Sequence, residues 1–145
     1  MTDDKPTAIV IQRFKVAPQR VYDAVLDPQI IAQFMFGPLL REEEILHIRN
    51  QPVEGGAFSF KVRRGEDEID HVGKYLELTP PNRIVFTWNI APDDAYSVVS
   101  IDITETPDGA SMKLVHQIDP QWAEYVQRTQ EGWAKMFGVL ADLLV

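Results

Sequence analysis

Three histidines carry the side chains best suited to metal or acid–base chemistry. His47, His71 and His116 are separated by more than twenty residues, and no HExxH motif is present. The sequence therefore lacks the short ligand spacing that zinc sites commonly show. The three could meet only from different strands, where a histidine is more often packed in the core or turned to solvent. We expect no metal and no metal-ligating residue.

His116 is the best single polar anchor of the three. It follows Met112 and Leu114 at alternate positions, and this parity places its side chain on the inward face of a strand. The competing interpretation is a core histidine whose hydrogen bonds are satisfied within the protein.

Nucleophilic and nucleotide chemistry lack their usual motifs. No serine lies in a GxSxG motif, and the pair Gly55-Gly56 belongs neither to GxGxxG nor to a phosphate-binding loop. The chain has no cysteine, which excludes disulfides, thiolate zinc sites, iron–sulfur ligation and a cysteine nucleophile. We expect no cofactor and assign no catalytic residue, although the sequence leaves enzymatic activity open.

Three acidic clusters could be offered as catalytic carboxylates or calcium ligands. They are Glu42 to Glu44, Glu66 to Asp70 and Asp93-Asp94. The second and third are predicted on turns, where charge keeps a loop solvated, and none has the ligand spacing of an EF-hand. Arg63-Arg64 beside the second cluster predicts a surface ion pair.

Size and charge narrow the class of protein and its partners. The chain has 145 residues, 45% of them hydrophobic, and a net charge of −8, which predicts one globular domain over 1–145, with 1–7 as a flexible end. The negative field disfavours nucleic acid and anionic membranes as partners. The polar start and the absence of a long apolar run predict a soluble, cytoplasmic protein.

The elements that must position these side chains follow from periodicity and turn residues. Residues 8–16 predict a first strand, and Pro18 opens a helix that ends at Asp27-Pro28. A second short helix carries Ile30, Ile31 and Phe34 and is ended by Gly37-Pro38. Alternating apolar residues then predict further strands, separated by Gly- and Pro-rich turns that favour an antiparallel meander. These strands carry Ile45/His47, Phe58/Phe60/Val62, Ile84/Phe86/Trp88, Val99/Ile101/Ile103 and Met112/Leu114/His116/Ile118.

The last element is predicted to be one long amphipathic helix. Asp119 caps it and Pro120 opens it, while Gly132 and Gly138 would mark a kink or a close backbone approach. Its apolar stripe contains Trp122, Tyr125, Val126, Thr129, Trp133, Met136, Phe137, Leu140 and Leu144. This stripe must lie on the sheet, which gives an α+β architecture.

The chain resembles the single-domain proteins similar to the C-terminal domain of the activator of Hsp90 ATPase, within the START/Bet v 1-like helix-grip superfamily. The resemblance rests on Arg13, Ala17-Pro18 with Val21, Asp27-Pro28, EGGAFSF (54–60), GKYLELTPPNRIVFTW (73–88), MKLVH (112–116) and EGW (131–133). The family usually has a tryptophan where Phe34 stands and a threonine where Ala110 stands. The resemblance implies a curved antiparallel sheet of about seven strands wrapped on a long C-terminal helix, with two short helices after strand one.

Aromatic residues dominate the elements that should converge between the sheet and the C-terminal helix. A strongly bowed sheet would leave a cavity there, whereas a flatter one would be filled by side chains. His71, Tyr75 and His116 could supply polar points in it. The predicted ligand-binding residues are Phe34, Phe60, Tyr75, Trp88, His116, Trp133 and Phe137.

Three functions remain as hypotheses. The leading one is a binding module for a hydrophobic or aromatic small molecule in that cavity. The resemblance implies a second, a co-chaperone or stress-response protein whose surface meets an Hsp90-type partner. It also implies a third, a polyketide cyclase/dehydratase-like enzyme, which would need an acid–base pair such as His116 with Tyr75.

Overall fold

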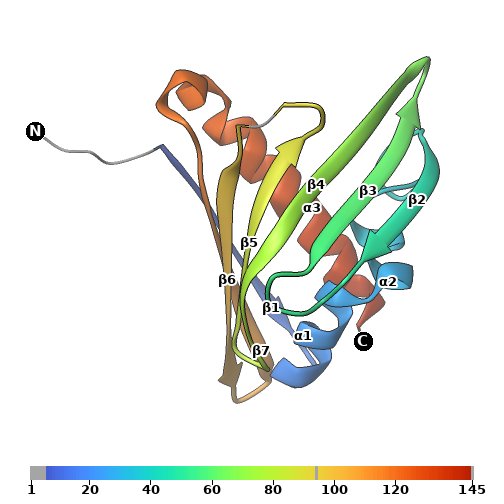
Figure 1. Ribbon diagram of the computed structural model, residues 1–145. Coiled ribbons are helices and arrows are strands. Elements are labelled where there is room, and N and C mark those ends of the chain that lie inside the picture. Colours follow the sequence, from blue (N-terminus) through green and yellow to red (C-terminus); the bar gives the residue numbers. More distant parts are fainter. Residues whose placement is uncertain (1–5, 94, 145) are drawn as a thin grey trace, which may run out of the picture.

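A seven-stranded antiparallel sheet wraps around a C-terminal helix in the computed structural model, which describes residues 6–93 and 95–144 (Figure 1). The strand order is β1-β7-β6-β5-β4-β3-β2. The strands are β1 (Thr7–Phe14), β2 (Glu44–Asn50), β3 (Ala57–Arg64), β4 (Asp67–Thr79), β5 (Arg83–Ile90), β6 (Ser97–Thr106) and β7 (Gly109–Gln117). The helices are α1 (Pro18–Leu26), α2 (Pro28–Phe34), the 3₁₀-helix η1 (Pro120–Tyr125) and α3 (Val126–Leu143).

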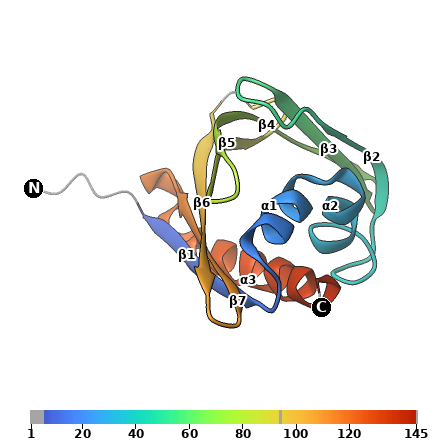
Figure 2. The same ribbon diagram turned by 90° about the horizontal axis from the view of Figure 1, so that it is seen from below.

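The six strands from β2 to β7 pair consecutively, and β1, the first strand in the chain, pairs with the last strand, β7. The predicted meander, the seven strands and the helix-grip arrangement are thereby confirmed. Gly65 turns the chain between β3 and β4 with a φ of 62°, a backbone conformation that a glycine adopts without steric cost. Seen from below, the sheet curls around α1 and α2, while α3 closes the remaining side (Figure 2).

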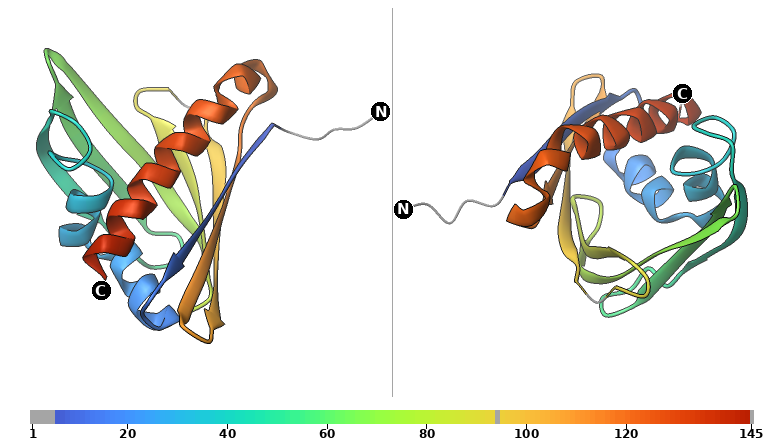
Figure 3. Two further views of the ribbon diagram at one scale, coloured as in Figure 1. Left: turned by 180° about the vertical axis from the view of Figure 1, so that it is seen from behind. Right: turned by 90° about the horizontal axis from the view of Figure 1, so that it is seen from above.

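The two short helices follow β1 as the sequence predicts, although α2 already ends at Phe34, before Gly37-Pro38. Pro18 opens α1, and the Asp27 carboxylate accepts a hydrogen bond from the Gln29 N–H at 2.9 Å, which caps α2. Val21 and Phe34 turn inward and are fully buried. The two helices thus fill the hollow of the sheet at the end opposite to η1 (Figures 2 and 3).

The C-terminal element differs from the single helix that was predicted. Asp119 does cap it, accepting from the Gln121 N–H at 3.0 Å, but Trp122 has non-helical dihedrals, and the first six residues form a 3₁₀-helix. A 3₁₀ turn has three residues rather than 3.6, so the apolar stripe shifts around the axis. Trp122 and Tyr125 are therefore 51% and 38% exposed, whereas Trp133 and Phe137 on α3 are buried. No close approach occurs at Gly132 or Gly138, where an added Cβ would meet no atom within 4 Å.

Two predictions about the chain's charged segments and ends are wrong. Residues Asp67 to Asp70 lie on β4 rather than on a turn, and Thr7 begins β1 instead of belonging to a flexible end. Pro6 is ordered as well, since its carbonyl oxygen accepts from the Ile118 N–H at 2.8 Å. The rest of the predicted flexible end, residues 1–5, and Asp94 lie outside the described residues.

Glu43 of the first acidic cluster has a fully buried side chain. Its carboxylate accepts from Arg64 Nε at 2.7 Å, from Arg41 Nη1 at 3.2 Å and from the Gly37 N–H at 2.8 Å. Burial alone would raise the pKa of Glu43, but these hydrogen bonds and the two positive charges together hold that pKa below its usual value. Arg64 therefore anchors the segment between α2 and β2 to β3, which corrects the predicted surface pair. Arg63 does form surface pairs, with Glu44 and Glu68.

None of the helices within 6–93 and 95–144 is long and apolar enough to cross a membrane.

Candidate functional site

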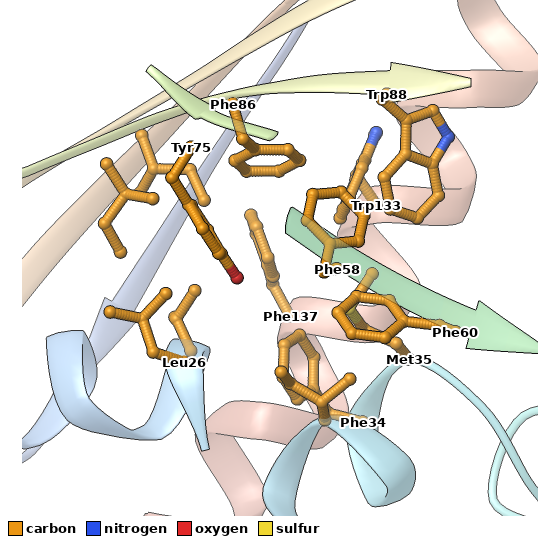
Figure 4. Close-up of a pocket in the computed structure, with 14 residues that line it drawn as sticks. Leu26, Phe34, Met35, Phe58, Phe60, Tyr75, Phe86, Trp88, Trp133 and Phe137 are labelled. Carbon is orange, nitrogen blue, oxygen red and sulfur yellow. The ribbon is translucent and has the colours of Figure 1, made fainter. Parts of the chain in front are cut away.

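Inward-facing side chains of β3, β4 and β5 meet α2 and α3 in an aromatic cluster at the centre of the molecule (Figure 4). Six of the seven predicted ligand-binding residues line one cavity there: Phe34, Phe60, Tyr75, Trp88, Trp133 and Phe137. His116 does not line it. Phe58 and Phe86 also line it, as do the aliphatic side chains of Val25, Leu26, Ile31, Met35, Ile84 and Ile101.

This central cavity is almost filled by its own walls. Its free volume is about 30 Å³, which is room for one or two water molecules and far less than an aromatic ligand requires. The Phe58 ring helps to fill the cavity, because it stacks on Phe60 at a centroid distance of 4.7 Å and meets Phe86 edge-on at 5.7 Å. The interior aromatic residues are accommodated here mainly by packing against each other.

The Tyr75 hydroxyl links neighbouring elements of the fold and is not available to bind a ligand. Its hydroxyl donates to Asn50 Oδ1 at 2.6 Å, and Asn50 Nδ2 donates to the Leu26 carbonyl at 2.7 Å. In Figure 4 the oxygen lies on the side of the cluster near Leu26, and Trp88 and Trp133 lie on the other side. Burial raises the pKa of Tyr75. The chain of bonds therefore joins β4 to β2 and α1.

A second, open pocket lies beside the central one, between the start of β6, the end of β7, η1 and the first turn of α3. We call it the η1 pocket. Its volume is about 300 Å³, and it is lined by Trp88, Ala95, Tyr96, Ser97, His116, Ile118, Asp119, Gln121, Trp122, Tyr125 and Thr129. Of these, the sequence had pointed to Trp88 and His116 as ligand-binding residues. Trp122 and Tyr125 had been assigned to the buried stripe of the last helix, because the sequence pattern did not reveal the 3₁₀ turn.

His116 sits at the floor of the η1 pocket, buried and fully hydrogen-bonded. Trp133 Nε1–H donates to its Nδ1 at 3.1 Å, and its Nε2 lies 2.7 Å from Ser97 Oγ. An indole nitrogen only donates, so Nδ1 must be the acceptor and Nε2 must carry the proton. The Ser97 hydroxyl therefore accepts a hydrogen bond from His116 and donates one to the Trp88 carbonyl at 3.2 Å.

This network holds His116 neutral. Burial lowers the pKa of His116 to about 4, and protonation at Nδ1 would break the bond from Trp133. His116 thus faces inward, as predicted, and also satisfies the competing description of a core histidine. The acid–base pair suggested for an enzyme is not formed, because His116 and Tyr75 line different pockets.

The two pockets are separated by a pair of tryptophans. Trp88 lines both of them, and its ring lies 5.5 Å from that of Trp133 between centroids. Trp133 in turn packs on Phe137 at 5.8 Å. The wall between the pockets is consequently part of the packed core, held in place by the bond to His116.

The other two histidines have structural settings. His71 is buried between Phe36 and Trp88, and its Nδ1 lies 2.9 Å from the Phe60 carbonyl oxygen, to which it donates. Burial lowers its pKa. It lines neither the central cavity nor the η1 pocket.

His47 lies on the outer face of the sheet in a row with Ser59 and Asp70. A bulge in β2 after Ile45 changes the register, so His47 does not lie on the same face of the sheet as Ile45. Ser59 Oγ lies 2.8 Å from His47 Nε2 and donates to Asp70 at 2.7 Å. Serine stands between the other two, whereas in a catalytic triad histidine does. Within the described part of the chain, no three acidic or histidine side chains are grouped as metal ligands.

The geometry defines the class of protein as an α+β helix-grip domain whose sheet encloses a C-terminal helix. A family described as Activator of Hsp90 ATPase homolog 1-like protein matches residues 15–145, and the chain belongs to this family. The resemblance read from the sequence is confirmed.

Solved structures share the fold over nearly the whole chain. Protein CV1439 from Chromobacterium violaceum is 25% identical with a TM-score of 0.79, over 96% of this chain and 97% of that one. Protein NE0264 from Nitrosomonas europaea is 18% identical with a TM-score of 0.82, over 99% and 96%. CalU16 from Micromonospora echinospora is 22% identical with a TM-score of 0.70, over 95% and 75%. A comparison with curated proteins gave no match.

Proposed function

We propose that the chain binds a hydrophobic or aromatic small molecule, and that the ligand occupies the η1 pocket at one end of the space between sheet and C-terminal helix. The observation that carries this proposal is an open pocket of about 300 Å³ with aromatic side chains around a buried, hydrogen-bonded floor. Ligand sites are commonly apolar hollows of this size with a few fixed polar groups.

The central cavity supports the site without holding the ligand. With about 30 Å³ free, it gives Trp88 and Trp133 a rigid backing, and a rigid wall lowers the entropy lost when a ligand binds. Of the predicted ligand-binding residues, Trp88 and His116 would touch the ligand, and the others would shape the wall behind them.

The proposal is tested by titrating 2-naphthylmethanol, a neutral aromatic probe, into ¹⁵N-labelled protein. We expect amide shifts confined to Ser97, His116 and η1, together with a raised thermal midpoint. The double variant Trp122→Ala/Tyr125→Ala should lose the shifts and stay folded, since neither side chain is buried. Leu76→Ala on β4, also exposed and outside the η1 pocket, is the matched control. Unperturbed spectra with neutral, cationic and anionic naphthalenes alike would refute the proposal.

A co-chaperone role is the second candidate, favoured by the family and by a shallow groove of about 700 Å³ on the outer face of β3, β4 and β5. The groove carries exposed apolar side chains, among them Leu76 and Tyr96. The test is the ATPase rate of the host's Hsp90-type chaperone with added protein. We expect no stimulation; a saturable, salt-sensitive increase of several-fold would rank the surface role first.

A further inference from the structure

We infer that the η1 pocket selects ligands that carry a protonated amine on an aromatic or apolar body. This inference rests on the proposed function, since it names the chemical class that the same pocket takes. It follows from three properties of the lining: which hydrogen-bonding groups remain free, which charges are present, and which aromatic faces are exposed.

The floor offers a hydrogen-bond acceptor and no spare hydrogen. His116 donates its Nε2–H to Ser97, and Ser97 donates its hydroxyl hydrogen to the Trp88 carbonyl. Nδ1 of His116 accepts from Trp133. A serine oxygen has two lone pairs, and only one of them is occupied. A ligand that donates an N–H to Ser97 Oγ completes this network, whereas a carboxylate finds only acceptors at the floor.

The charge of the lining has one sign. Asp119 is the charged residue among the eleven described residues that line the pocket, none of which is a lysine or arginine. Among residues 6–93 and 95–144, its carboxylate accepts a bond from the Gln121 N–H, which leaves oxygen lone pairs for a ligand. The chain's net charge of −8 acts in the same direction. A cation is therefore attracted at the rim, and an anion is repelled there.

The aromatic side chains between rim and floor favour a cation as well. Trp122 and Tyr125 pack at a centroid distance of 5.7 Å with an interplanar angle of 46° and remain partly exposed, while Trp88 and Tyr96 line the pocket with them. Aromatic faces attract ammonium groups through the ring quadrupole, best on tryptophan. The same rings bury the apolar body of the ligand.

The test compares four naphthalenes that differ only in the polar group, measured by calorimetry at pH 7.5. They are 2-naphthylmethylammonium, its N,N,N-trimethyl analogue, 2-naphthylmethanol and 2-naphthoate. The primary ammonium should bind about five- to thirtyfold more tightly than the alcohol, and naphthoate should bind most weakly. The trimethyl analogue keeps the charge but has no N–H, so it should bind less tightly than the primary ammonium.

A variant of the rim separates charge from shape. Asp119→Asn keeps the helix cap, because asparagine also caps well, and it should lower the affinity for the primary ammonium about two- to fivefold while leaving that for the alcohol unchanged. Asp142→Asn near the end of α3, an exposed position outside the pocket, makes the same change in net charge and should leave both affinities unchanged.

The outcomes separate this inference from the function on which it rests. Naphthoate or the alcohol binding as tightly as the ammonium would overturn the selectivity and leave small-molecule binding intact. Equal binding of the trimethyl analogue would overturn the assignment of Ser97 as the acceptor. No binding by any of the four would overturn both proposals.

Discussion

Trp133 donates its indole hydrogen to His116 and packs between Trp88 and Phe137, so one side chain joins the polar floor of the η1 pocket to the aromatic core. The partner of each residue in this group could not be read from the sequence. The alternation of the strands placed His116 and Trp88 in the same space as Trp133, which lies on the apolar stripe of the last helix. Hydrogen bonds between side chains, however, depend on rotamers that periodicity does not encode.

Trp133→Ala should lower the free energy of unfolding by about 3–5 kcal/mol, because it empties a site that is only 6% exposed. Trp122→Ala is the matched control. It removes the same side chain from a 51% exposed position and should change stability by less than about 0.5 kcal/mol. Chemical denaturation of both variants measures the difference, and an unchanged midpoint for Trp133→Ala would contradict the docking of α3.

His116 should make the protein less stable in mild acid. The folded-state pKa is lowered to about 4, whereas the unfolded value is about 6.5, so the unfolded state takes up the proton first. Stability is therefore complete above pH 6.5 and falls as the pH drops towards 4, by about 2 kcal/mol between pH 7.5 and pH 5. His71, whose pKa is also lowered by burial, adds to the same trend.

Urea unfolding at pH 5 and pH 7.5 measures this slope. His116→Gln is a suitable comparison, because the amide can still accept from Trp133 and donate to Ser97 without titrating. The variant should be less sensitive to pH than the native chain. An identical slope in both proteins would assign the effect to other groups.

Among the elements, β4 shows most clearly what the pattern predicted and what it did not. His71 and Tyr75 were named as possible polar points of the interior, and both are buried. The alternating apolar pattern did not identify the strand itself, and its first residues were assigned to a turn, because Asp67, Glu68 and Asp70 belong to the end of the β3–β4 hairpin, where a strand can carry charged residues. Likewise, Asp119 and Pro120 open a 3₁₀-helix and an α-helix equally well, so only the backbone dihedral angles distinguish them.

Gly73 on β4 should be the least replaceable residue of that strand. It lies opposite Phe58, and a Cβ there would collide with the Thr87 carbonyl oxygen and with the Phe58 ring. We expect Gly73→Ala to cost about 3 kcal/mol, the upper end of ordinary overpacking. Gly132→Ala on α3 meets no atom within 4 Å and should instead stabilise by up to about 1 kcal/mol. Thermal scanning compares the two, and equal effects would contradict the close packing of β3, β4 and β5.

At the scale of the whole molecule, the sheet is curved but open, with β1 and β2 as its edges. The helix-grip topology was predictable because the strands from β2 to β7 follow one another through short connections and the final apolar stripe needs a partner. The free volume inside was not, since small changes in sheet curvature decide whether large rings pack together or leave a hollow. Phe34, Phe60, Tyr75, Trp133 and Phe137 lie in the packed core, whereas Trp88 and His116 also line the open pocket beside it.

The edges should differ from the centre in hydrogen exchange. β6 lies between β5 and β7 and carries the fully buried Val99, Ile101 and Ile103, whereas β2 has one neighbour and few buried side chains. We expect the slowest amide exchange on β6 and the fastest strand exchange on β2. At the other edge, the β1 amide of Ile9 donates to Gln130 Oε1 of α3 and should exchange more slowly than the β2 amides. Uniform exchange across the sheet would contradict this ranking.

The three tryptophans lie at graded depths between solvent and core: Trp122 is half exposed on η1, Trp88 is partly buried at the wall between the pockets, and Trp133 is buried beside His116. Indole emission moves to shorter wavelength as its surroundings lose water, so the intrinsic fluorescence spectrum of this chain is a sum of three contributions centred at different wavelengths. A ligand in the η1 pocket would shift the long-wavelength contribution of Trp122, whereas unfolding would shift the short-wavelength contribution of Trp133. The fold thus contains its own optical probes for occupancy and for integrity, with no label attached.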